Sequence, residues 1–557
     1  MKPILVLRST RALRHGLLAM LALIAGAHAE APRIFAITDV RIVPAPGQVI
    51  DHGTVVLRDG LIEAVGRHVD APDDAWIIAG QDDWTVYPAF IDAASSVGLK
   101  SEPAGGPPGR PKSPDNQQRP GSPNELDAVH PERAVVDRLT LNHAGVDRYR
   151  KLGFAVVQIL PATGVFRGES AVILLRDAPA RELILADRKN QVIALETSSF
   201  MARKYPSSTL GAVATVRQTL LDARRQRVWT ERYAANPAGM RHPEYRASDA
   251  PLLALLRGEQ QVVFVSLRAL DPGRFHALTT EFDLHAMTVA AGLADRPDSL
   301  RAAGMPVLLP LSLPDKPELS KADDALEITL QEMQASVRAP GLPAALAQAG
   351  VEFAFVTAGM KSARDFSGNL AAVVEAGLPP EQALAAVTTV PARLLGMERM
   401  LGTIEPGKQA NLLIVQGELF TARPVFRHLF VDGYHEKIKA EKTIGDPTAV
   451  VDPRGTWEVT SEVMGRRSGS TWEITGSKDN YRGSSESSRA GKHPFKSVEL
   501  RGNALTVVRE TPRGIVDITV VVSEASFTGE TTLESPRGSV KMKIEGRRIA
   551  GPENNEQ

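Results

Sequence analysis

Apolar residues are spaced differently in successive parts of the chain. Short alternating segments typical of strands occupy residues 35–80, and the clearest is a hairpin of residues 54–58 and 61–65. Its Asp59-Gly60 turn supplies the two positive φ angles that a type I′ turn requires. A matching strand pattern returns at residues 411–415. Two β-rich stretches on either side of a long middle region predict a small β-sandwich built from residues 30–86 and 401–436.

The middle region, residues 87–400, alternates fully apolar runs with helical patterns. Runs of this kind are typical of parallel strands that are buried on both faces. The apolar runs are residues 154–160, 192–195, 262–265, 307–309 and 353–356. A region of about 310 residues fits a (β/α)8 TIM-like barrel with insertions better than an open sheet. Pro380 and Glu381 mark one helix start, because proline and an acidic residue favour the first turn.

Residues 101–123 are rich in Pro, Gly, Asn and Gln and do not fit a core element. They follow the first predicted barrel strand, so we expect a long loop over the mouth of the barrel. This loop is either a lid or a solvated insertion.

The C-terminal part of the chain has a third sequence pattern. A polar stretch with two prolines, residues 437–453, is predicted to be a linker. From residue 454 to 557, strands are separated by turns at residues 501–503, 512–514 and 535–538, as in an antiparallel barrel or sandwich. Trp457 and Trp472 both lie in a Thr-Trp-Glu context, which suggests adjacent strands of one small barrel.

The amino terminus has the features of an export signal. Four basic residues precede an apolar run of eleven residues, 16–26, and Ala27-His28-Ala29 follows. The run is too short to span a bilayer about 30 Å thick, and small residues at this spacing are what signal peptidase cleaves. We expect a signal peptide over residues 1–29, a mature chain that begins at Glu30, and a periplasmic or secreted location. A buried core helix and an uncleaved anchor are the alternatives.

Length and composition argue against several classes of protein. With 557 residues the chain is too long for one core and long enough for two or three domains. Lys+Arg and Asp+Glu are equal at 65 each and aromatic residues are only 5%, which argues against a nucleic-acid partner. A mean hydropathy of −0.12 argues against several membrane spans, and we expect none after signal cleavage. The chain has no cysteine, which excludes disulfides, cysteine nucleophiles and iron–sulfur clusters.

Residues 87–92, Tyr-Pro-Ala-Phe-Ile-Asp, resemble the Pro-Gly-Phe-Ile-Asp-x-His-x-His segment of the amidohydrolase superfamily, in particular its imidazolonepropionase-like exported members. Residues 377–396 and 401–412 resemble the family's last helices and its return into the sandwich. The resemblance covers residues 35–436 and implies a sandwich-plus-barrel fold. It also implies hydrolysis of carbon–nitrogen bonds with one or two divalent ions. The C-terminal domain lies outside it.

The resemblance implies metal ligands that this sequence does not carry. Family members bind the ions with His-x-His after strand 1, histidines after strands 5 and 6, and an aspartate after strand 8. The His-x-His positions fall on Ala94 and Ser96, the strand-5 position on Ser266, the strand-6 position near Ala291-Gly292, and the strand-8 position on Ala358. We therefore predict no metal and no other cofactor.

Other polar residues remain candidates for a pocket at the carboxyl ends of the barrel strands. They are Asp92, Ser96, Ser266 and Thr357, and a further pocket candidate is His285, which is predicted to lie on the sixth strand. A serine nucleophile needs an adjacent base, and no G-x-S-x-G or Ser-x-x-Lys motif marks one. No residue is therefore assigned a catalytic role.

Two functions stay open. One is a non-catalytic protein that binds a small molecule or a partner at the barrel mouth, with a homo-oligomer as one form. The other is an active hydrolase of non-peptide carbon–nitrogen bonds with a relocated or metal-free site.

Overall fold

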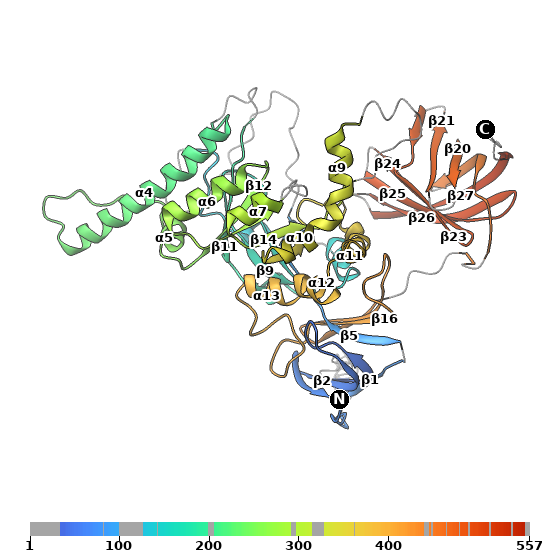
Figure 1. Ribbon diagram of the computed structural model, residues 1–557, viewed down its shortest axis with the longest axis horizontal. Coiled ribbons are helices and arrows are strands. Elements are labelled where there is room, and N and C mark those ends of the chain that lie inside the picture. The colour runs from blue at the N-terminus through green and yellow to red at the C-terminus, as the bar shows by residue number, and fades with distance from the viewer. Residues whose placement is uncertain are drawn as a thin grey trace, which may run out of the picture. The chain divides into compact units, whose positions relative to one another are not determined.

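The computed structural model divides the chain into two compact units, Met1–Ile438 and Lys439–Gln557 (Figure 1). It describes residues 34–438 and 445–551, apart from residues 82, 100–125, 142, 199–204, 291–296, 315–327, 361, 447–448, 464, 478–479, 488–490, 512–513 and 536–537. The predicted signal peptide, the predicted loop 101–123 and Ala291-Gly292 lie outside the described residues.

Segments from both ends of the first unit build one eight-stranded sheet, in which the order is β18-β17-β16-β5-β1-β2-β3 and β4 pairs with β1. The strands are β1 (Ile34–Ile42), β2 (Ile50–Arg58), β3 (Leu61–Gly66), β4 (Trp76–Ala79), β5 (Trp84–Pro88), β16 (Leu412–Gln416), β17 (Val425–Val431) and β18 (Tyr434–Lys437). The two ends meet where β5 pairs antiparallel with β16.

The β2–β3 hairpin confirms the predicted turn, with φ values of 49° at Asp59 and 84° at Gly60. This turn packs tightly against the turn between β17 and β18. A Cβ at Gly433 would lie 2.6 Å from the Gly60 Cα, so both turns need glycine for their close approach.

The middle region folds as an α/β domain, and each predicted apolar run forms a strand. Its strands are β6 (Phe90–Ser95), β7 (Phe154–Ile159), β8 (Phe166–Glu169), β9 (Ala171–Leu174), β10 (Ile184–Ala186), β11 (Asn190–Ala194), β12 (Gln261–Ser266), β13 (Ala286–Ala290), β14 (Val307–Pro310) and β15 (Phe353–Val356). β6 is parallel to β7, and β11 to β15 pair with one another in order, all parallel.

One segment departs from a regular series of eight βα units. β9 pairs antiparallel with β7, and β8 pairs antiparallel with β11, so this segment runs against its neighbours. Only residues 160–165 connect β7 to β8. A parallel crossover needs about a dozen residues or more, so the chain turns back as an antiparallel pair instead.

Helices cover the strands, and α12 begins at Pro380 as predicted. The helices are α2 (His143–Arg150), α3 (Ala180–Leu183), α4 (Thr209–Ala235), α5 (Asp249–Leu256), α6 (Asp271–Phe282), α7 (Pro297–Ala303), α9 (Leu330–Arg338), α10 (Leu342–Gln348), α11 (Phe366–Glu375), α12 (Pro380–Val387) and α13 (Thr389–Leu394), with 3-10 turns at Val135–Arg138, Ala339–Gly341 and Ala363–Asp365. No helix in the described part of the chain has the length and apolar character that crossing a membrane takes.

The second unit is a closed antiparallel barrel. Its strands are β19 (Gly455–Val463), β20 (Arg466–Ser477), β21 (Asn480–Ser487), β22 (Gly491–Pro494), β23 (Ser497–Arg501), β24 (Ala504–Thr511), β25 (Gly514–Val522), β26 (Ser526–Ser535) and β27 (Gly538–Ala550). Pairing of β19 with β27 and of β20 with β21 closes the ring, while β22 pairs with β21.

Trp457 and Trp472 lie directly opposite each other on β19 and β20, which confirms that they belong to adjacent strands. Both side chains are buried and contact Phe527, with ring centroids 5.1 Å and 5.3 Å away. Side chains from within this unit therefore form its core.

We expect residues 454–557 expressed alone to be soluble, rich in β-structure by circular dichroism, and to unfold cooperatively. The reason is that the ring of strands closes within this segment and encloses a buried apolar cluster. An unfolded fragment beside a folded full chain would show that the strands depend on the first unit.

Candidate functional site

The strands of the α/β domain form a four-stranded sheet in the order β10-β9-β7-β6 and a six-stranded sheet in the order β15-β14-β13-β12-β11-β8. Asp92 lies where the end strands β6 and β15 come together. Its side chain is fully buried. Oδ1 accepts hydrogen bonds from the backbone N–H groups of Ala94 at 3.1 Å and Thr357 at 3.2 Å, and Oδ2 accepts from Thr357 Oγ1 at 2.5 Å. The Ala358 N–H also donates to the Ala94 carbonyl at 2.9 Å. Asp92 therefore joins the second half of β6 to the carboxyl end of β15.

A chain of hydroxyl groups extends this contact. Tyr149 on α2 lies 3.0 Å from Thr357 Oγ1, and Ser95 Oγ donates to the Tyr149 hydroxyl at 3.2 Å. When Asp92 is ionised, Thr357 donates its one hydroxyl hydrogen to Asp92, so Tyr149 donates to Thr357. Ser95, Tyr149 and Thr357 thus form an ordered relay that ends on the Asp92 carboxylate.

Burial is the main influence on the charge of this group. It raises the pKa of Asp92 to about 7, although hydrogen bonds from Thr357, Ala94 and Ser95 act in the opposite direction. Burial and the nearby Asp92 charge also raise the pKa of Tyr149. Burial therefore favours the protonated form of this carboxyl group. A raised pKa of this kind is common in active sites and also occurs in structural networks.

The other predicted pocket residues lie apart from this pair. Ser96 is exposed directly after β6. Ser266 is buried at the end of β12 and hydrogen-bonded to Thr288 Oγ1 at 3.0 Å. His285 was predicted to lie on the sixth barrel strand, and this prediction is wrong. It is exposed immediately before β13, at the amino end of that strand, because β13 begins only at Ala286.

No sequence motif marks Tyr149. It comes from a helix 54 positions beyond Ser95. No local signal distinguishes a helical tyrosine that packs on a core from one that donates a hydrogen bond.

The metal centre that the resemblance implies does not fit these residues. The side chains of Ala94 and Ala358 are methyl groups and have no donor atom for a metal ion. The Ser266 hydroxyl is hydrogen-bonded to Thr288, and the Thr357 hydroxyl is hydrogen-bonded to Asp92. Within the described ranges, no group of three or more His, Asp or Glu side chains could hold a metal ion. The chemistry available here is therefore that of hydroxyl groups and one buried carboxyl.

Two surface hollows lie elsewhere in the first unit. One of about 420 Å³ is bordered by α4 and Met240, and one of about 570 Å³ by α11 and residues 420–422. Neither is lined by Asp92, Thr357 or Tyr149.

Comparison with known proteins gives one family match and several similar structures. Residues 292–446 match the sequence profile of the Amidohydrolase family. An amidohydrolase from Thermotoga maritima MSB8 has a similar structure, with 21% identity, a TM-score of 0.57, and coverage of 72% of this chain and 99% of that one. A Xaa-Pro dipeptidase with bound methionine is 16% identical over 72% of this chain and 100% of its own, with a TM-score of 0.40. The A. niger ochratoxinase is 12% identical over 73% and 96%, with a TM-score of 0.42.

No curated protein matches the chain by sequence. The resemblance to the amidohydrolase superfamily is nevertheless confirmed, by the family match at residues 292–446 and by the fold that the chain shares with the Thermotoga protein.

Proposed function

We propose that the chain is an exported, non-hydrolytic relative of the amidohydrolases that acts by binding a small molecule or a partner. The observation that carries this proposal is the hydrogen-bonded closure of β6 and β15 by Asp92, Thr357 and the backbone of Ala94. It occupies the strand ends at which the superfamily places its ion. A β6–β15 junction held by hydrogen bonds needs no metal to keep its shape.

The combined absence of the metal ligands and of the proton acceptor supports a non-hydrolytic function more strongly than the absence of any one of them. Metal-dependent hydrolysis needs an ion that lowers the pKa of bound water to near 7. Here Ala94 and Ala358 stand at positions that the family fills with a histidine and an aspartate. The ligands of the ion and the group that would accept a proton from its water are therefore absent at the same end of the strands.

One observation favours a second candidate, a metal-free hydrolase. Thr357 Oγ1 and Asp92 Oδ2 are 2.5 Å apart, and a hydroxyl paired with a base whose pKa is about 7 is the arrangement of an activated nucleophile. Against it, Asp92 has no exposed surface and Thr357 is only 6% exposed. A substrate would have to open the strand junction to reach this hydroxyl.

Thr357→Val separates the two functions, because valine keeps the shape of threonine and removes the hydroxyl. We expect the wild type and T357V to hydrolyse a panel of N-acyl amino acids and cyclic amides no faster than buffer alone, with or without added Zn²⁺ or Mn²⁺. Turnover by the wild type that T357V loses would establish the metal-free hydrolase. Turnover that requires the added metal would contradict both functions.

Export is proposed from the amino-terminal sequence alone. Amino-terminal sequencing of the exported protein should begin at Glu30. A mature fraction that still carries Met1 would contradict cleavage.

A further inference from the structure

The second half of α4 and the loop after it form a projecting arm, defined here as residues 224–248. Buried residues of α4 end at Ala223, and Figure 1 shows the helix continuing beyond the strands of its unit. The loop folds back along the helix. Trp229 Nε1 donates to the Arg241 carbonyl at 3.1 Å and Gln226 Nε2 donates to the Glu244 carbonyl at 3.0 Å. The loop of the arm is therefore held to the helix by hydrogen bonds, and the arm lies outside the buried core.

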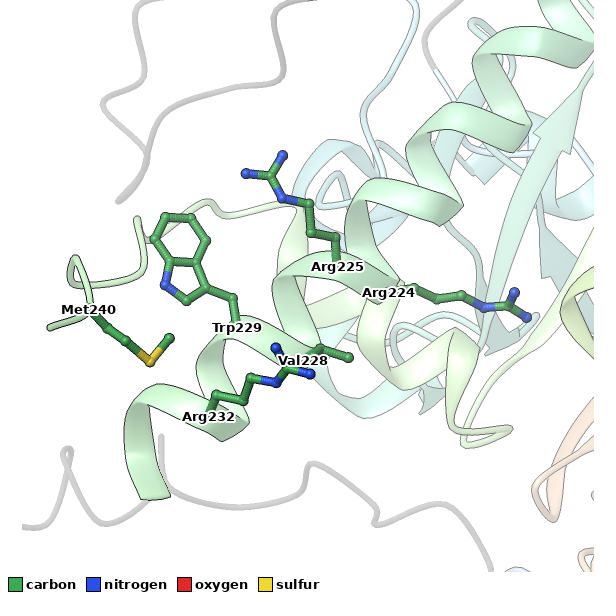
Figure 2. Close-up of a pocket in the computed structure, with 6 residues that line it drawn as sticks. All are labelled: Arg224, Arg225, Val228, Trp229, Arg232 and Met240. Carbon is green, nitrogen blue, oxygen red and sulfur yellow. The ribbon is translucent and has the colours of Figure 1, made fainter. Parts of the chain in front are cut away.

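The arm carries an open hollow of about 420 Å³ (Figure 2). Arg225, Trp229 and Arg232 line it from one face of the helix, since residues four and seven positions apart lie on the same side. Met240 borders it from the loop, and Val228 beside it is 40% exposed. An apolar floor between guanidinium groups suits a side chain that is aromatic and has acidic neighbours.

Positive charge is concentrated on this arm. Residues 224–248 contain six arginines and two glutamates, a net charge of +4 in a chain whose total is +0. Both glutamates are already paired, Glu231 with Arg227 and Glu244 with Arg246. Arg225 and Arg232, by contrast, form no ion pair with any residue that the structure describes.

The same unit carries a segment of opposite charge. Residues 51–83 contain eight Asp or Glu and two arginines, a net charge of −6. In this segment Trp76 is 61% exposed and Ile77 49% exposed on β4, a strand that pairs only with β1 among the described strands. Asp70 and Asp73 are exposed just before them.

We propose that the arm of one copy binds the segment around Trp76 of a second copy of this chain. The Trp76 ring would enter the hollow beside Trp229, and Asp70 and Asp73 would face Arg225 and Arg232. Each copy has both surfaces, so two equivalent contacts about a two-fold axis would give a closed dimer. This inference does not depend on the proposed function of the barrel.

Sedimentation velocity of the full mature chain tests the proposal, because attraction between exposed charges is screened by salt. We expect a dimer at about 20 mM salt and weaker association at about 500 mM. R225E/R232E and D70K/D73K should each weaken association at least tenfold. An equimolar mixture of the two variants should recover the dimer, because each reversed surface then meets an opposite one.

R181E/R399E, which reverses two exposed arginines outside both segments, is the matched control and should dimerise like the wild type. Circular dichroism of each variant confirms folding. A wild type that stays monomeric at low salt, a dimer that survives both charge reversals, or a mixture that fails to associate would overturn the proposal. Binding of the arm to an acidic peptide without any dimer would assign it to another protein.

Discussion

Replacing Asp92 with asparagine is expected to remove a large part of the pH dependence of stability in the first unit. Between about pH 4 and pH 8, the difference in unfolding free energy between wild type and D92N should change on the order of 4 kcal/mol. D92N should gain relative to the wild type as the pH rises. Chemical denaturation at several pH values, followed by circular dichroism, measures this change.

The sign follows from the pKa of Asp92, which burial raises from 3.8 to about 7 in the folded chain. The folded state therefore holds the proton more tightly than the unfolded state. Its contribution to stability is complete below about pH 3.8 and is lost as the pH rises toward 7. Asparagine never ionises, and its amide can still accept from the N–H groups of Ala94 and Thr357.

Titrating groups that lie away from Asp92 affect both proteins equally and cancel in this comparison. His428, for example, has a pKa lowered to about 4 by burial, so its own contribution is lost as the pH falls from 6.5 toward 4. A difference between wild type and D92N that stays constant across the pH range would contradict the assignment of a raised pKa to Asp92.

Trp457→Ala should destabilise the second unit by about 3 to 5 kcal/mol, the range for removing a large buried aromatic side chain. Trp457 has no exposed surface and packs against Phe527. Its Nε1 donates to the Pro453 carbonyl at 2.9 Å, and the Arg548 guanidinium lies 4.4 Å from its ring centre. Alanine loses these contacts and leaves a cavity in the barrel.

Ile549→Ala is the control in the same barrel, because Ile549 is 54% exposed on β27. It should change stability by no more than about 0.5 kcal/mol. Denaturant unfolding of the full chain, monitored by circular dichroism, reports both effects. Equal effects for the two variants would mean that Trp457 is not part of the barrel core.

Features with strong local signals were predictable from the sequence. The Asp59-Gly60 turn was found because only a few residue pairs adopt two positive φ values. The buried strands were found because each is a short, fully apolar run. Trp457 and Trp472 were placed on adjacent strands because a repeated context marks equivalent positions in neighbouring strands, and the structure pairs them directly.

Features that depend on long-range packing were not predictable from the sequence. A fully buried strand has the same composition in either direction, so the reversal of β8 and β9 left no mark except the short connection before β8. Tyr149 reaches Thr357 across 208 positions of sequence. The helical pattern of α4 likewise does not reveal where its burial ends.

The candidate site was predictable only in part. Alignment of residues 87–92 with the family segment identified Asp92 and the substituted position Ala94, because the motif is continuous in sequence. The partnership of Asp92 with Thr357 joins residues 265 positions apart. His285 was misplaced although it directly precedes the apolar run 286–290, an order that already indicates the amino end of the strand.

Elemental analysis of the purified full chain tests the central claim that the first unit holds no catalytic metal ion. We expect well under one equivalent of zinc, manganese or iron per chain, because the resemblance assigns the ligand positions to Ala94, Ser96, Ser266 and Ala358, and Ala94 and Ala358 have no donor atom in their side chains. A stoichiometric metal ion, whose removal by a chelator lowers the melting temperature, would contradict it.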